Sequence, residues 1–141
     1  MKEDYVSFET AKLLKEKGFV QECDYATSWY AKQYYKNSCV GEWFEGEHQI
    51  IEDIDDKYNI SYLLEKDVFI PAPTLQMAMK WLREVHNICI SVDVKIGGGK
   101  YYVCISSTEN GLSHDVLEFK VWDTFEEACE VAIKYCLENL I

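Results

Sequence analysis

The chain has 141 residues, 48% of them hydrophobic and 14% aromatic, so it is too apolar for a disordered protein and long enough for one domain, residues 1–141. Its net charge of −11, from 25 acidic and 14 basic residues, lacks the basic footprint of a nucleic-acid binder. No run of about 18 apolar residues and no apolar signal core at the N-terminus are present, so we expect a cytoplasmic protein without membrane contact.

The cysteines give no sign of a metal or redox site. No two of them have the C-x-x-C spacing on which zinc sites and thioredoxin-like chemistry depend. A cytoplasmic chain also keeps its thiols reduced. We therefore expect six free thiols, no metal and no cofactor; the residues are Cys23, Cys39, Cys89, Cys104, Cys129 and Cys136.

Three stretches have the apolar spacing of amphipathic helices and residues that favour a helix start. They are residues 7–17, 74–87 and 124–140. Ser7 and Thr74 are the expected N-caps of the first two, and Thr124 with Glu127 forms a T-x-x-E capping box. The middle helix has an apolar arc of roughly 200°, wider than a surface helix needs, which predicts that it is covered on two sides.

The clearest strand signal is the alternation at residues 88–96 and 100–106, separated by three glycines. With a third strand at 116–122, these residues predict a three-stranded antiparallel meander over 88–122. The glycines predict a tight turn rather than a phosphate-binding loop, because no nucleotide-binding pattern surrounds them. The expected pairs of the hairpin are Ile96 with Tyr101, Val94 with Val103 and Val92 with Ile105.

Residues 20–70 are harder to interpret. One or two strands are expected between 20 and 35, and a turn at 36–38 with a strand at 39–44 would make a hairpin. Residues 45–59 suit either a short helix or an ordered loop, and 61–70 an extended segment. The whole chain is expected to be an α+β domain in which an antiparallel sheet is covered on one face by the three helices.

The acidic charge is concentrated in residues 42–67, which hold nine acids and two lysines, a net charge of −7. Apolar side chains interleave with these acids, as in interface cores, so the stretch is a candidate interaction surface for a basic protein partner. The alternative is a solvated acidic face whose apolar residues pack on the sheet. A calcium loop is excluded because Tyr58 and Leu64 replace the glycine and glutamate that an EF-hand needs. The candidate residues are Trp43, Phe44, Glu52, Asp53, Asp55, Asp56 and Tyr58.

Nothing in the sequence supports catalysis. His48, His86 and His114 lie in no recognisable catalytic motif, and each is expected to be a surface or capping residue. No catalytic residue is therefore assigned.

Three segments, residues 5–15, 72–84 and 124–140, resemble a family of small uncharacterised proteins from gut Bacteroides and their phages or mobile elements. That resemblance implies no activity and no catalytic residues. Three strands followed by a helix at Thr124 are also similar to the β-β-β-α DNA-binding arm of phage integrases, which reads DNA with a basic sheet face. Residues 88–123 hold five acids, three lysines and no arginine, which argues against that function here.

From the composition we expect a small acidic protein that acts by protein contact, and the resemblance implies that it is associated with a phage or mobile element. A nucleic-acid-associated accessory protein is the alternative from another class, and an enzyme is the third.

Overall fold

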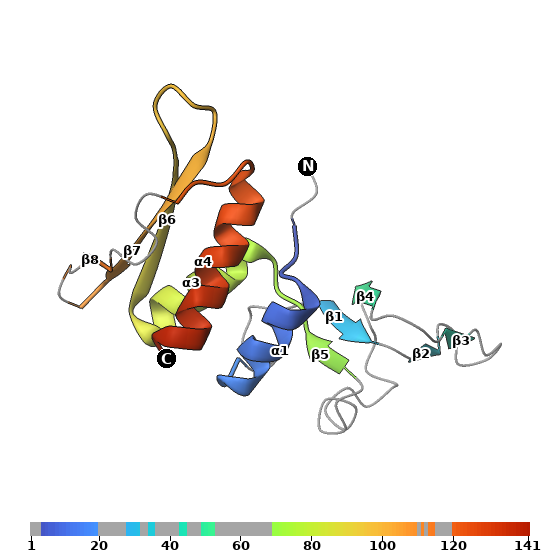
Figure 1. Ribbon diagram of the computed structural model, residues 1–141. Helices are drawn as coiled ribbons and strands as arrows, with labels where there is room; N and C mark the ends of the chain where they lie inside the picture. Colours follow the sequence, from blue (N-terminus) through green and yellow to red (C-terminus); the bar gives the residue numbers. More distant parts are fainter. Residues whose placement is uncertain are drawn as a thin grey trace.

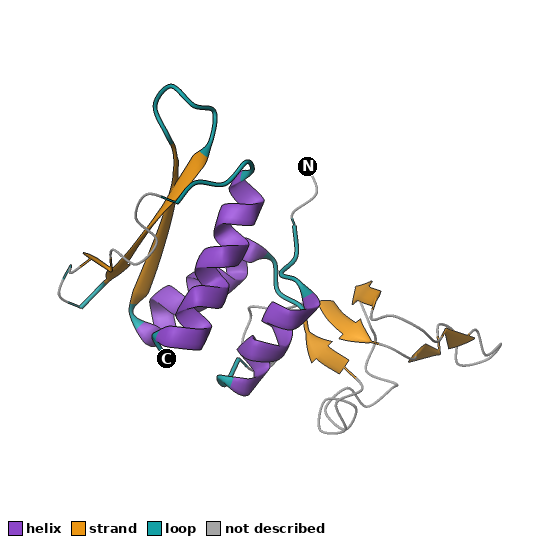
Figure 2. Cartoon of the chain, viewed as in Figure 1, coloured by secondary structure: helices purple, strands orange, loops and turns teal. Residues whose placement is uncertain are grey.

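The computed structural model describes residues 4–19, 28–31, 34–35, 43–44, 49–52, 69–109, 111, 113–114 and 120–141. Helices and antiparallel strands are mixed (Figures 1 and 2). In chain order the elements are α1 (Phe8–Glu16), β1 (Ser28–Ala31), β2 (Tyr34–Tyr35), β3 (Trp43–Phe44), β4 (Gln49–Glu52), β5 (Phe69–Pro71), α3 (Leu75–His86), β6 (Ile88–Val94), β7 (Tyr101–Ser107), β8 (Ser113–His114) and α4 (Phe125–Asn139).

The three expected helices are confirmed, together with their N-caps. The side-chain oxygens of Ser7, Thr74 and Thr124 each accept a hydrogen bond from the backbone N–H three residues later, at 3.3, 3.2 and 3.1 Å. Each bond satisfies an N–H that the first turn of a helix leaves without a partner. These local contacts fix where α1, α3 and α4 begin.

Helix α3 lies in the middle of the core, as its wide apolar arc predicts. Trp81 and Leu82 are almost completely buried, whereas Val85 near the end of the helix is 51% exposed. The ring of Phe19, just after α1, packs edge-on against Trp81 with centroids 5.4 Å apart. Helix α3 also contacts both α4 and β6, so it is covered on two sides.

Helix α4 buries a wider stripe than the sequence suggests. The apolar spacing predicts that six side chains face the core: Phe125, Ala128, Cys129, Ala132, Cys136 and Leu140. The helix also buries Ile133 and Leu137, while Phe125 and Leu140 are only partly buried. The extra width follows from its position, because α4 packs on α1, α3, β6 and β7 together. In Figure 1 it lies between the β6–β7 hairpin and α1. The expected cover of one sheet by three helices is thus only partly found, since α1 packs chiefly on α4 and β5.

The β6–β7 hairpin forms with a register two residues from the predicted one. Val94 pairs with Tyr101 and Val92 with Val103, so the predicted partner of Tyr101, Ile96, is in the loop and fully exposed. The backbone N–H of Lys95 donates to the carbonyl of Lys100 at 2.7 Å, which closes a four-residue loop with positive φ at its first and last glycines. Both registers place the same residues on the covered face, and for this reason alternation alone cannot choose between them.

The predicted third strand at 116–122 is not found as a strand in its described part. Lys120 and Val121 lie outside any strand, and Trp122 forms an isolated bridge with Tyr101. The third strand of this sheet is instead β8, where His114 pairs with Ile105. All pairs of an uninterrupted antiparallel ladder have the same sum of residue numbers. That sum is 223 for Tyr101 with Trp122 and 219 for Ile105 with His114, so the two pairs do not belong to one ladder. Residues 115–119 are outside the described part.

A second sheet has the order β4-β1-β5, and β2 pairs with β3 as a separate short hairpin. The β2–β3 pairing agrees with the expected hairpin at its two described ends, while the expected turn at 36–38 and strand residues 39–42 lie outside the described residues. Within 45–59, residues 49–52 are strand β4, so the helix interpretation is wrong for these four residues; the rest of the segment lies outside the described residues. Ile50 and Ile51 obtain their partners from β1, which is distant in sequence. Pro71 is on an edge strand, where a missing N–H is tolerated.

Candidate functional site

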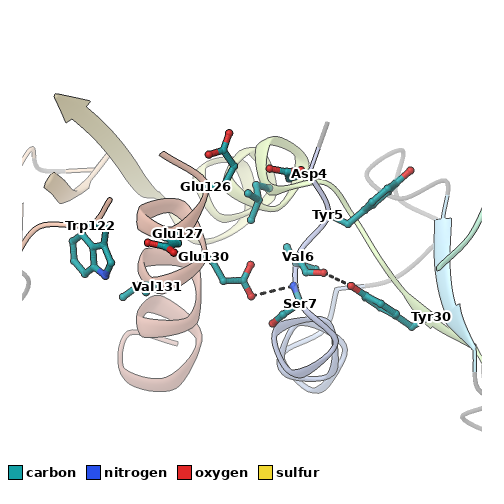
Figure 3. Close-up of a pocket in the computed structure, with 11 residues that line it drawn as sticks. Asp4, Tyr5, Val6, Ser7, Tyr30, Trp122, Glu126, Glu127, Glu130 and Val131 are labelled. Atoms are coloured by element: carbon teal, nitrogen blue, oxygen red, sulfur yellow. Dashed lines mark hydrogen bonds between the residues drawn. The ribbon is translucent and has the colours of Figure 1, made fainter. Parts of the chain in front are cut away.

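An open groove of about 670 Å³ lies between the first turns of α4 and the N-terminal segment Asp4–Ser7 (Figure 3). We call it the α4 groove. Its lining combines carboxylates, aromatic rings and a few aliphatic side chains. The lining residues are Asp4, Tyr5, Val6, Ser7, Tyr30, Leu75, Trp122, Glu126, Glu127, Glu130 and Val131.

The N-terminal segment is held in place by its backbone. The N–H of Val6 donates to the carbonyl of Pro73 at 3.0 Å, and the carbonyl of Asp4 accepts from the N–H of Leu75 at 3.0 Å. The hydroxyl of Tyr30 donates to the carbonyl of Val6 at 2.6 Å. This wall of the groove is therefore fixed to the start of α3 and to β1, although it is close to the N-terminus.

Glu130 joins the two walls. Its Oε1 accepts from the N–H of Ser7 at 3.0 Å and from the hydroxyl of Thr10 at 2.6 Å. Thr10 is completely buried, so these bonds fix both the carboxylate and the packing of α1 on α4. Figure 3 shows Glu130 reaching from α4 toward Ser7. Within the described part of the chain, its Oε2 has no hydrogen-bond partner.

The groove is strongly acidic, with four carboxylates and, among its described lining residues, no basic side chain. Glu126 and Glu127 are in the first turn of α4, where negative charge is favoured by the helix dipole. Asp4 and Glu130 are not in the first turn of a helix, so the helix dipole does not stabilise their charges in this way. None of the four forms an ion pair with a described residue.

The negative charge of the groove contributes to raised pKa values of two neighbouring groups, Tyr30 and Cys129. Burial, and then the charge of Glu130, raise the pKa of the Tyr30 hydroxyl above its ordinary value. Burial, followed by the charges of Glu126 and Glu130, raises the pKa of the Cys129 thiol to about 11. The field of the carboxylates therefore extends from α4 to the opposite wall.

The chemistry of the groove suits a positively charged ligand better than a reaction. Carboxylates attract ammonium and guanidinium groups, and aromatic faces bind cations that are partly desolvated. The hydroxyl of Ser7, a possible nucleophile, is engaged by the N–H of Thr10 as an N-cap and donates to the Thr10 hydroxyl at 3.1 Å. No histidine is among the described lining residues that could activate it.

The candidate residues expected from sequence lie elsewhere or outside the described part. Trp43 and Phe44 form β3 and Glu52 ends β4. The other four candidates lie outside the described residues; they are Asp53, Asp55, Asp56 and Tyr58.

Sequence reasoning missed the groove because its acids come from both ends of the chain. Asp4 and Glu130 are more than a hundred residues apart, and each alone is an ordinary charged residue. Glu130 also falls opposite the apolar stripe of the last helix, a position at which the sequence predicts an ordinary exposed residue. The only local signal was Thr10, a polar residue at a position that faces the core.

His86 is half-buried rather than a free surface residue. Its ring packs edge-on against Trp81 with centroids 4.6 Å apart, and its Nε2 is buried without a hydrogen-bond partner among the described residues. Burial lowers the pKa of His86, so the expected role as a cationic cap of α3 is disfavoured. His114 is in β8, and His48 lies outside the described part.

The four described cysteines are free thiols, and Cys23 and Cys39 lie outside the described residues. Cys136 is buried, which raises the pKa of its thiol to about 12, whereas Cys104 is exposed. Among the residues described, no group of three or more potential metal ligands is found.

The outer face of the β6–β7 hairpin is uncovered, and its strand residues include no base; Lys95 and Lys100 lie at the loop end of the hairpin. Alternation places Asp93 and Tyr102, a directly opposed pair, on this face together with small side chains. The small residues on this face are Cys89, Ser91, Cys104 and Ser106. A DNA-reading sheet would carry lysine or arginine at such positions.

No family model, curated protein or solved structure matches this chain. Across the described residues, no helix has both the length and the apolar character to cross a bilayer.

Proposed function

We propose that this protein is a binding protein that recognises a basic protein partner through the α4 groove. The observation that carries the proposal is the set of four groove carboxylates without an ion-pair partner among the described residues. Like charges held together oppose folding, and a basic partner relieves that repulsion on binding. Complementary charge also speeds encounter and makes it sensitive to salt.

The resemblance to Bacteroides and phage proteins suggests where to look for the partner. We propose a cytoplasmic accessory role for a phage or mobile element, and the four free thiols support a reducing compartment. A Bacteroides lysate is therefore the material of choice for capture. The nucleic-acid-associated alternative has less support, because the strand residues on the outer face of the β6–β7 hairpin include Asp93 and no base, and Lys100 at the loop is paired with Asp123.

The test compares two sets of neutralised acids in a pull-down. One variant changes the groove, with Asp4→Asn, Glu126→Gln and Glu127→Gln. The other changes the acidic stretch found from sequence, with the substitutions Glu52→Gln, Asp53→Asn, Asp55→Asn and Asp56→Asn. We expect the wild type to retain a basic protein at low salt, and the groove variant alone to lose it.

Circular dichroism of both variants checks that the fold is kept. Loss of the partner only in the acidic-stretch variant would move the interface to residues 42–67, as the sequence suggested. Capture that neither variant nor high salt weakens would contradict the proposal.

A further inference from the structure

The α4 groove has two chemically different ends, which limits what can occupy it. In Figure 3, Trp122 and Val131 are on one side of α4, and Tyr5 and Tyr30 are on the other. Glu130 points to the second side, toward Ser7. A ligand that uses the whole groove must therefore cross the first turns of α4.

One carboxylate at the second end is preorganised for a cation. Two hydrogen bonds hold Oε1 of Glu130, so the carboxylate cannot rotate away, and Oε2 remains for a ligand. Asp4 lies on the facing segment, and its backbone is fixed by Leu75. A cation placed between them would bind one carboxylate that is already held in place and a second on a segment whose backbone is fixed, which lowers the entropy cost of binding.

We infer that the occupant is an extended segment of a partner protein, with an arginine or lysine side chain bound between Asp4 and Glu130 and an apolar side chain on Trp122. This inference rests on the proposed function and specifies the ligand of the same groove. Charge complementarity selects a basic segment, and an open groove of about 670 Å³ has room for a few side chains of an extended segment rather than for a folded domain. The aliphatic stem of the arginine or lysine can lie along the groove while its head stays with the acids.

The test titrates 15N-labelled protein with a capped oligoarginine peptide of about six residues that ends in leucine. Comparison ligands are the same peptide with citrulline in place of arginine, and spermidine, which has positive charge but no peptide backbone. We expect the arginine peptide to shift the indole N–H signal of Trp122 and the amide signal of Val131. If the citrulline peptide or spermidine binds as tightly as the arginine peptide, the inference is overturned.

The matched variants are Asp4→Asn with Glu130→Gln, and Asp93→Asn with Glu138→Gln as a control of equal charge. The amide oxygen of glutamine can still accept from Thr10 and Ser7, so the fold is expected to persist. The groove variant loses two exposed ion pairs, and pairs near the middle of the usual range together should make it bind the arginine peptide about five- to tenfold more weakly. The control should change binding less than about twofold.

Should the groove variant fail to fold, Glu126→Gln with Glu127→Gln leaves the Glu130 contacts intact and should also weaken binding. Equal weakening by the control would show a net-charge effect and overturn the inference. Self-association of the protein that the groove variant abolishes would identify a second copy as the occupant, and would also overturn it. A basic protein captured from the lysate that no peptide can replace would leave the proposed function standing while this inference fails.

Discussion

The hydrogen bond from Thr10 to Glu130 should be one of the main contacts between α1 and α4. Thr10→Val replaces the hydroxyl by a methyl group of similar size and removes the 2.6 Å bond. A hydrogen bond to a charged group is worth about 1.5–3 kcal/mol, and the half-buried position of Glu130 places it at the lower end. We expect the free energy of unfolding to fall by about 1.5–2 kcal/mol.

Urea denaturation followed by circular dichroism measures this loss. With an m-value of roughly 1.5 kcal/mol/M, the midpoint should fall by about 1 M. Thr10→Ser keeps the hydroxyl and is the control, with a smaller loss from its missing methyl group. In a double-mutant cycle with Glu130→Ala, the two losses should not add. A loss under about 0.5 kcal/mol for Thr10→Val, or strictly additive losses, would refute the role assigned to this bond.

Three further outcomes follow from burial. Leu82→Ala removes a completely buried side chain and should cost about 3–4 kcal/mol in urea denaturation, while Val85→Ala on the same helix should cost less than about 1 kcal/mol. In native protein, iodoacetamide should label Cys104 but not Cys136, whose pKa is raised to about 12, as peptide mass spectrometry would show. The pKa of His86 is lowered in the folded state. Its contribution to the free energy of unfolding should therefore be complete above about pH 6.5 and decrease as the pH falls through the lowered pKa. The urea midpoint should decline with acidification over this range.

Each of these outcomes has a clear contrary result. Equal losses for Leu82→Ala and Val85→Ala would mean that α3 is not oriented as described. Labelling of Cys136 as fast as that of Cys104 would contradict its burial. A His86→Gln variant with an unchanged pH dependence of the urea midpoint would show that other groups cause the decline.

The helices could be predicted because their signals are local. Ser7, Thr74 and Thr124 begin α1, α3 and α4 by bonds to residues three positions away, so a short window of sequence contains both partners. The apolar width of α3 likewise predicted its central place in the core.

Strand pairing was harder to predict because the partners are distant and several registers bury the same face. The β6–β7 register shifted by two without changing which residues are covered, and β4 forms only because β1 lies beside it. The same limit applies to the groove. Asp4, Tyr30 and Glu130 are brought together by contacts with α3, with the N-terminal segment and with α1, and these contacts join residues that are far apart in the sequence.

Zero-length carbodiimide cross-linking of the captured basic partner tests the central claim most directly, because it joins a lysine only to a carboxylate in contact with it. The account predicts cross-links from partner lysines to Asp4, Glu126, Glu127 or Glu130 in the peptide map. Cross-links confined to acids outside the groove, such as Asp93 or Glu138, would contradict it.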